Sequence, residues 1–211
     1  MISAFWNSKM ETSQWSLDYP RLLHEARAEN YQKAIDFLRE ELPYVWYDQY
    51  KRNCRHEPNV SRFYYNTFEY IFDDCSSATC ETESRLVVAV GQSSPPNKVR
   101  TKDDRRLRGW IGPTNKIFGS EWDKGHFIGH CIGGAVNKAE VNVFPQRRIL
   151  NRGISEEGKL FRLMEDYCAT HPGSFCFNRP LYDDNTARPA FLEFGVLKQD
   201  RTLWVHTFDN R

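Results

Sequence analysis

Three short polar motifs follow one another within residues 123–153, and their order restricts the local fold more than any other feature of the sequence. Asp123-Lys-Gly-His126 lies in a strand-like stretch at residues 122–128. Asn142-Val-Phe-Pro-Gln146 follows, and Asn151-Arg-Gly153 then stands at the entrance to a predicted helix that ends at residues 171–173. Side chains of the first and third motifs are therefore expected on different elements, a strand and the helix that follows it.

The rest of the chain predicts a mixture of helices and strands. Helical periodicity covers residues 18–42, with Asn30 as a break, Pro43 as the end, and a second short helix from there to Tyr50. The aromatic-rich stretch at 61–72 is expected to pack against the rest of the protein. Strands are predicted in four places, with a hairpin turn at 199–200 between the last two: residues 85–92, 174–177, 190–196 and 202–207.

The residue types of the three motifs suit hydrolysis of a phosphodiester. A neutral histidine such as His126 takes a proton from water near pH 7. An asparagine side chain offers a neutral oxygen to a hard cation such as Mg²⁺, which keeps most of its waters. Basic side chains hold phosphate and offset the charge that develops on it. The candidates for this role are Lys124, Arg147, Arg148, Arg152 and Lys159.

The same motifs resemble those of the DNA/RNA non-specific endonucleases with a ββα-metal fold, whose signature is Asp-Arg-Gly-His, then Asn-x-x-Pro-Gln, then a helical Asn-x-Gly. The residues after each motif look closest to the branch found in bacterial polymorphic toxins. The resemblance covers residues 98–211 and implies an α+β fold, with an antiparallel sheet and a ββα-metal core. Residues 1–92 are then an added N-terminal helical and aromatic-rich region of unassigned role, with a boundary in the loop at 92–98.

The resemblance also implies roles for individual residues. It makes His126 the general base and Asn151 the one protein ligand to Mg²⁺ or Mn²⁺, with Asn142 orienting the site. Lys124, His130, Arg147, Arg148 and Arg152 are expected to bind the substrate, whose cleavage leaves a 5′-phosphate and a 3′-hydroxyl. Each role has a simpler structural alternative. These are a buried hydrogen-bonded histidine for His126, a helix cap for Asn151 and a turn residue for Asn142.

Two features depart from the family pattern. Lys124 replaces the usual arginine, which keeps the charge and loses the bidentate fork. Position 159, where a glutamate often assists the metal, is lysine. Glu165 would lie about 21 Å along one continuous helix from Asn151, too far to help the metal. His130 would lie about 13 Å from His126 if the segment were an extended strand, so it is expected to support the site and not to act as the base.

Charge and composition point to an anionic partner. Residues 1–84 carry 9 Lys and Arg against 14 Asp and Glu, whereas residues 85–211 carry 20 against 14. DNA and/or RNA is the expected partner, with the basic stretch at 98–116 as one wall of a groove and an inhibitor protein as a further candidate. No apolar run or export signal stands out, so no membrane partner is expected and a cytoplasmic location is predicted. The main functional alternative is a nucleic-acid-binding module that keeps this fold without turnover.

The six cysteines include one cluster with metal-ligand character. Cys54 and His56 precede Cys75 and Cys80, which together offer four ligand types suited to tetrahedral zinc. The spacing is irregular, so buried reduced thiols are the favoured interpretation and a zinc-stapled interaction protein is the third functional alternative.

Overall fold

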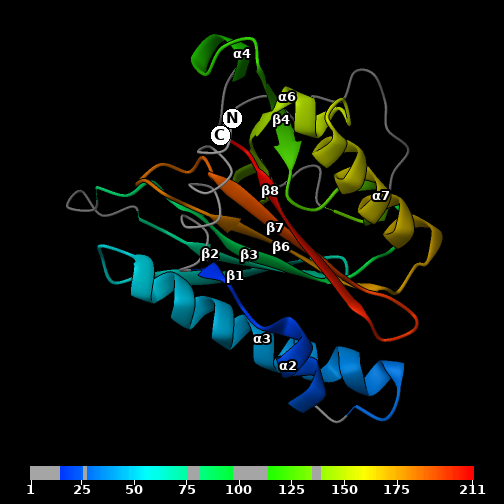
Figure 1. Ribbon diagram of the computed structural model, residues 1–211. Coiled ribbons are helices and arrows are strands. Elements are labelled where there is room, and N and C mark those ends of the chain that lie inside the picture. The colour runs from blue at the N-terminus through cyan, green and yellow to red at the C-terminus, as the bar shows by residue number, and fades with distance from the viewer. Residues whose placement is uncertain (1–14, 26–27, 76–80, 97–113, 135–138) are drawn as a thin grey trace, which may run out of the picture.

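A six-stranded antiparallel sheet forms the centre of the described part of the chain (Figure 1). The computed structural model describes residues 15–25, 28–75, 81–96, 114–134 and 139–211. The strands lie in the order β1-β2-β3-β6-β7-β8, each antiparallel to its neighbour. Their bounds are β1 Val60–Tyr65, β2 Phe68–Asp73, β3 Arg85–Gln92, β6 Phe175–Leu181, β7 Phe191–Leu197 and β8 Leu203–Asp209.

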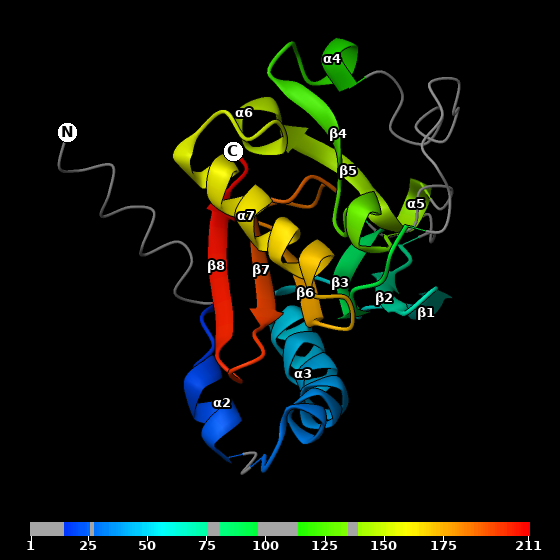
Figure 2. The same ribbon diagram turned by 90° about the vertical axis from the view of Figure 1, so that its right-hand side faces the viewer.

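Further elements cover both faces of this sheet, which gives the molecule three layers. Helices α2 and α3 lie against one face (Figure 1). The other face carries α7 and a two-stranded antiparallel sheet of β4 and β5, seen together in Figure 2. The helices are α2 Tyr19–Glu25, α3 Tyr31–Asn53, α4 Thr114–Ile117, α5 Ala139–Asn142, α6 Arg148–Asn151 and α7 Glu156–Thr170. The two remaining strands are β4 Trp122–His126 and β5 Val143–Arg147.

β3 lies inside the sheet because its side chains are apolar on both faces. Every residue from Leu86 to Val90 is at most 3% exposed. Leu86 and Ala89 pack toward the α7 face, while Val87, Val88 and Val90 pack toward α3. The strand predicted at 85–92 is confirmed, and so are the three C-terminal strands, which the structure extends or shifts by a few residues.

The α3 helix corrects the prediction that Pro43 ends a helix. Asn30 does separate two helices, and its side chain caps α3 by accepting a hydrogen bond from Lys33 N. The helix then continues through Pro43 to Asn53. A proline in a helix interior costs about 3 kcal/mol, but burying one large apolar side chain contributes about 1.5–3 kcal/mol. Leu42 and Trp46, both 0% exposed, lie on either side of the proline, so packing against the sheet outweighs its cost.

Strands from both sides of the predicted boundary at residues 92–98 belong to the one central sheet. β3 on one side of it pairs with β6 on the other, and Gln92 stands opposite Phe175. The chain before the boundary also supplies the β1–β2 hairpin, made from the aromatic-rich stretch. Phe68 and Phe72 of that stretch are buried, as expected for packing, whereas Tyr64 is 71% exposed. Residues 60–92 and 175–209 therefore share one sheet.

Each face of the sheet has its own apolar core. The core beneath α3 includes Leu38 and Trp46 packed with Phe177. The core beneath α7 joins Phe161 of that helix to Phe194 of the sheet. The helix predicted after the third motif is thus confirmed as α7, with Ser155 as the N-cap. Because α7 and the β4–β5 sheet close this second core, their position relative to each other is fixed by packing.

Candidate active site

A pocket of about 290 Å³ lies between the β4–β5 sheet and α7, and four of the residues singled out from the sequence line it. These four are Lys124, His126, His130 and Asn151. The other lining residues are Gly129, Cys131, Gln146, Phe161, Arg162 and Glu165. The pocket therefore gathers histidine, amide, carboxyl and basic side chains from β4, the turn after it, β5, α6 and α7.

His126 is the last residue of β4, and Asn142 fixes the turn that follows it. The Asn142 side chain is 0% exposed and makes two hydrogen bonds to the main chain of Ile128. Its Oδ1 accepts from Ile128 N at 2.9 Å and its Nδ2 donates to Ile128 O at 3.0 Å. Phe127 N also donates to Asn142 O. Asn142 is thus held behind the pocket, where it sets the path of the chain next to His126.

The segment from His126 to His130 is not one extended strand, which corrects the assumption behind the separation of about 13 Å between the two histidines. β4 ends at His126, and a 3-10 turn begins at His130 and ends at Ile132. Gly133, with φ of +95°, closes this turn in the left-handed region. Because the chain bends between the two histidines, both reach the same pocket.

Asn151 ends α6, and a hydrogen bond orients its side-chain amide. Its Nδ2 donates to Asp123 Oδ2 at 3.4 Å, so the oxygen of the same amide group faces away from Asp123. Its main-chain carbonyl accepts from Arg162 of α7. Asn151 lines the pocket, and its amide oxygen is of the kind that a hard cation binds. Asn151 is not a helix N-cap, because α6 starts three residues before it and Ser155 caps α7.

Asp123 gathers two of the three arginines predicted to bind substrate. Arg152 donates to both of its carboxylate oxygens, at 2.7 and 3.1 Å, and Arg148 Nε donates at 3.2 Å. Although burial alone would raise it, these hydrogen bonds and that from Asn151 hold the pKa of Asp123 below its ordinary value. The third arginine, Arg147, pairs with Glu121 at 3.1 Å. None of the three lines the pocket, so the structure places them beside it in ion pairs.

Glu165 lines the same pocket as Asn151. This corrects the prediction that it lies too far from Asn151 to help the metal, which assumed one continuous helix. The chain leaves helical geometry after α6, and α7 starts afresh at Glu156. The two helices pack against each other, so residues from both reach one site. A Cβ atom at position 129 would lie 2.3 Å from Glu165 Oε1, and only glycine there leaves room for the carboxyl group. The sequence does contain a signal for this break. Gly153 follows Arg152 and stands just before the capping residue Ser155, which marks the end of one helix and the start of another.

The surroundings of Glu165 favour its neutral form. Burial, assisted by the charge of Asp166, raises its pKa to about 7, although Arg162 acts in the opposite direction. Arg162 Nη1 lies 3.6 Å from Glu165 Oε2. Burial also lowers the pKa of Lys124. The pocket thus holds a carboxyl group poised to ionise near neutrality beside two basic side chains.

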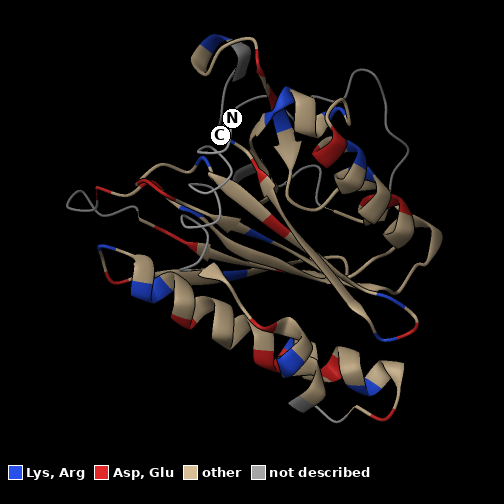
Figure 3. Ribbon diagram, viewed as in Figure 1, with Lys and Arg blue, Asp and Glu red and all other residues tan. Residues whose placement is uncertain are grey.

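The predicted basic groove wall lies mostly outside the described residues, since only positions 114–116 of the stretch at 98–116 are described. Arg105, Arg106 and Arg108 fall in the part that is not described. Both acidic and basic residues occur along α3 and along α7, as Figure 3 shows. Charge in these helices is therefore mixed and does not form a patch of one sign.

A second group of metal-ligating side chains lies away from the pocket, near the end of α3. Cys54, His56 and Asp73 have ligand atoms within 4.8 Å of one another. Cys75 also contacts His56, at 3.2 Å. Cys80, the fourth member of the cluster predicted from the sequence, lies outside the described residues. The structure thus adds Asp73, which the sequence analysis did not single out.

No protein-family model matches this chain, and a search of curated proteins finds no match. None of the helices in the described ranges has both the length and the apolar character that a membrane-spanning helix needs. The geometry of the pocket is therefore the observation on which a function has to be argued.

Proposed function

We propose that the protein is a metal-dependent nuclease that hydrolyses phosphodiester bonds of DNA and/or RNA with little sequence preference. The observation that carries the proposal is the pocket that gathers His126, Asn151 and Glu165 with two basic side chains. A base, oxygen ligands for a hard cation and positive charge are the groups that phosphodiester hydrolysis requires. The three sequence motifs meet at this pocket: each supplies a lining residue, with Gln146 from the second, and Asn142 of the second motif also braces the turn after His126.

The arrangement of elements around the pocket supports a ββα-metal core. β4 and β5 pair antiparallel, with Asp123 opposite Gln146 and His126 opposite Val143. α6 follows β5 directly and carries Asn151. The histidine and the asparagine thus come from a strand and a helix that face one site, as the resemblance to the non-specific endonucleases implies.

The donor atoms of the pocket fit a hard divalent cation such as Mg²⁺ or Mn²⁺. Asn151 offers an amide oxygen, and Glu165 offers a carboxyl group that ionises near neutral pH. Such an ion, when bound, polarises the phosphate and stabilises the oxygen that leaves. The carboxyl group that the sequence lacks at position 159 is thus supplied by Glu165, which weakens the alternative of a binding module without turnover.

The side chains of the pocket divide the remaining work. His126 takes the proton from the attacking water, since it stands at the rigid end of a strand and Asn142 fixes the turn beside it. Lys124 and Arg162 face the phosphate and offset its negative charge. Asp123 keeps Asn151, Arg148 and Arg152 in place through hydrogen bonds. These contacts are to phosphate groups and carry no base readout, so both DNA and RNA are candidate substrates.

Incubation of the purified protein with nucleic acid tests the proposal directly. We expect cleavage of supercoiled plasmid, of RNA or of both in Mg²⁺ or Mn²⁺, and none when a chelator is present. The products should form a broad smear on a gel because cutting is not confined to one sequence. The His126→Ala protein, prepared in parallel, controls for contaminating nuclease. Intact plasmid and intact RNA at every pH and with every divalent ion would reject the proposal.

Replacement of the two asparagines separates cation binding from bracing. Asn151→Ala removes the proposed cation ligand, so the Mg²⁺ concentration for half-maximal rate should rise at least about tenfold, by analogy with losses at metal sites. Asn142→Ala removes two buried hydrogen bonds to Ile128, so the free energy of unfolding should fall by about 2 kcal/mol. Turnover should also fall, with no change in the Mg²⁺ requirement. Rates measured across a Mg²⁺ titration compare the variants, and superimposable titrations would mean that the two roles are wrongly divided.

A further inference from the structure

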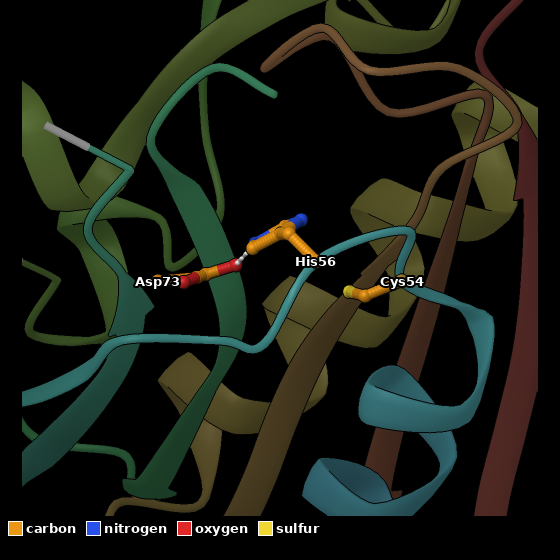
Figure 4. A group of neighbouring side chains, drawn as sticks. All are labelled: Cys54, His56 and Asp73. Atoms are coloured by element: carbon orange, nitrogen blue, oxygen red, sulfur yellow. Dashed lines mark hydrogen bonds and ion pairs between the residues drawn. The ribbon is translucent and has the colours of Figure 1, made fainter. Parts of the chain in front are cut away.

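The four side chains near the end of α3 come from two short segments that each supply two metal-ligating groups. Cys54 caps the C-terminus of α3, and His56 follows it by two residues. Asp73 is the last residue of β2, and Cys75 again follows by two residues. The His56 ring lies between Cys54 and Asp73 in Figure 4, with its Nε2 2.7 Å from Asp73 Oδ2. The same nitrogen lies 3.2 Å from Cys75 Sγ.

Both contacts fall on one ring nitrogen of His56, an arrangement that a shared hydrogen bond or a bound cation can produce. A histidine nitrogen carries at most one proton, so a hydrogen bond to both groups would divide that proton between them, whereas a cation would bind all of them fully. A nucleophilic Cys-His-Asp arrangement does not fit, because it places the thiol and the carboxylate on different ring nitrogens. Here both face Nε2. A cation among them would be bound by the imidazole nitrogen, the carboxylate and the sulfur at once.

We propose that Cys54, His56, Asp73 and Cys75 form a structural zinc site. Two thiolates, an imidazole and a carboxylate are a donor set that zinc binds in tetrahedral geometry, and the thiolates select against Mg²⁺. Ligand atoms around tetrahedral zinc lie about 3.3–3.8 Å apart, given metal–ligand bonds of about 2.0–2.3 Å. The 3.2 Å contact of Cys75 with His56 is close to this range, whereas the 2.7 Å contact of His56 with Asp73 is a hydrogen-bond distance that would lengthen around an ion. The ligand atoms of Cys54, His56 and Asp73 already lie within 4.8 Å of one another, and Cys75 would complete the set by moving closer to them. Four protein ligands close the site to substrate, which is typical of a structural ion.

Neighbouring groups hold Asp73 in the position of a ligand. Asp73 is 0% exposed, and its Oδ2 accepts from the Tyr50 hydroxyl at 2.8 Å. Its Oδ1 accepts from Asn59 N at 2.9 Å. The buried guanidinium of Arg85 in turn donates to the Tyr50 hydroxyl. Two thiolates and a carboxylate exceed the charge of Zn²⁺ by one, and Arg85 offsets that charge.

The position of the site suggests what the ion does. Cys54 and His56 follow the end of α3, whereas Asp73 and Cys75 lie at the end of β2. A bound ion therefore ties the end of the long helix to the end of β2 in the central sheet. The tie is separate from the pocket at His126 and does not depend on the proposed nuclease activity.

Metal binding by the unaltered protein is the first test. Protein stripped with chelator under reducing conditions should take up one zinc per chain, measured by elemental analysis after gel filtration. Cobalt in place of zinc should give the visible absorption of a tetrahedral site with thiolate-to-metal charge transfer. Both measurements use the parent protein, so neither depends on a variant that folds. Less than a tenth of an equivalent of zinc, or cobalt without the thiolate band, would overturn the site.

Variants then assign the ligands. Cys54→Ser and Cys75→Ser should each weaken zinc binding by more than about 100-fold, and Tyr50→Phe, which acts through Asp73, by about 10- to 100-fold. Circular dichroism confirms that each variant is folded. His126→Ala and Cys131→Ser, which alter the pocket, should keep full zinc stoichiometry and affinity, so a failure of the nuclease proposal does not affect the result. Unchanged affinity in both serine variants of the site would refute the assignment.

Discussion

Replacement of His126 by alanine should lower the rate of nucleic-acid cleavage by about 10²–10⁴-fold, the usual contribution of a general base. The variant loses the group that accepts the proton but keeps the cation ligands and the basic side chains of the pocket. Nucleic-acid binding, measured by fluorescence anisotropy in the presence of chelator, should therefore stay close to that of the parent. The thermal unfolding curve should also be close to that of the parent, because His126 is only partly buried.

Two further histidine variants make this result specific. His130→Ala should cause a smaller loss, because His130 shares the pocket but is expected to contact phosphate. His24→Ala, on the exposed surface of α2, should leave the rate unchanged. A folded His126→Ala protein that cuts at the parent rate would contradict the mechanism. A larger loss in His130→Ala would move the role of the base to that residue.

Replacement of Glu165 by glutamine should alter the pH dependence of protein stability. Between pH 4.5 and pH 8, the free energy of unfolding of the variant should rise relative to that of the parent by about 3 kcal/mol. Burial raises the pKa of Glu165 from its ordinary value of 4.5 to about 7, so the folded protein holds a proton that the unfolded chain releases between these values. This contribution to stability is fully present below about pH 4.5 and is lost as the pH rises to about 7. Glutamine resembles the neutral carboxyl group and does not ionise. The variant should thus be similar to the parent at pH 4.5 and more stable than it at pH 8.

Urea unfolding in the presence of chelator measures this difference across the pH range. Chelator is needed because a divalent cation in the pocket would favour the ionised carboxylate. Glu156→Gln is the matched control, since Glu156 is exposed at the start of the same helix and should not alter the slope. Parallel stability curves for the parent and Glu165→Gln would show that the carboxyl group is solvated in solution.

Local patterns were sufficient to predict most of the elements. The apolar run at 86–90 predicts a strand, and the structure confirms it as β3, which is buried on both faces. Asn30 predicts a break in the helical stretch, and the structure confirms it, with the Asn30 side chain capping the second helix. Pro43 misleads because its local cost is outweighed by contacts of α3 with a sheet whose strands lie far away in sequence. A local sequence pattern shows the cost of the proline but not these distant contacts.

The candidate site was predictable in its motifs but not in its full set of residues. His126, Lys124, His130 and Asn151 were singled out from the sequence and line one pocket. Glu165 was excluded because distance was measured along a helix that in fact breaks after Asn151. Arg148 and Arg152 were assigned to substrate on charge alone, and only the folded chain reveals that Asp123 binds both. Side-chain partners of this kind depend on tertiary packing.

The antiparallel partners β3 and β6 are separated in the chain by residues 93–174, which contain every residue of the candidate pocket. The two ends of this inserted segment lie side by side, since Ser93 N donates to Ser174 O and Gly173 N donates to Ser93 O. Without it, the six strands would form a simple meander of sequence neighbours. This inserted segment nevertheless carries Phe161 of α7, which packs on Phe194 and Phe208 of the sheet. The sheet therefore depends on the segment to bury the face beneath α7. Separation of His126 from Asn151 would therefore also expose this core to water. Loss of the site and global unfolding should then occur as one cooperative event.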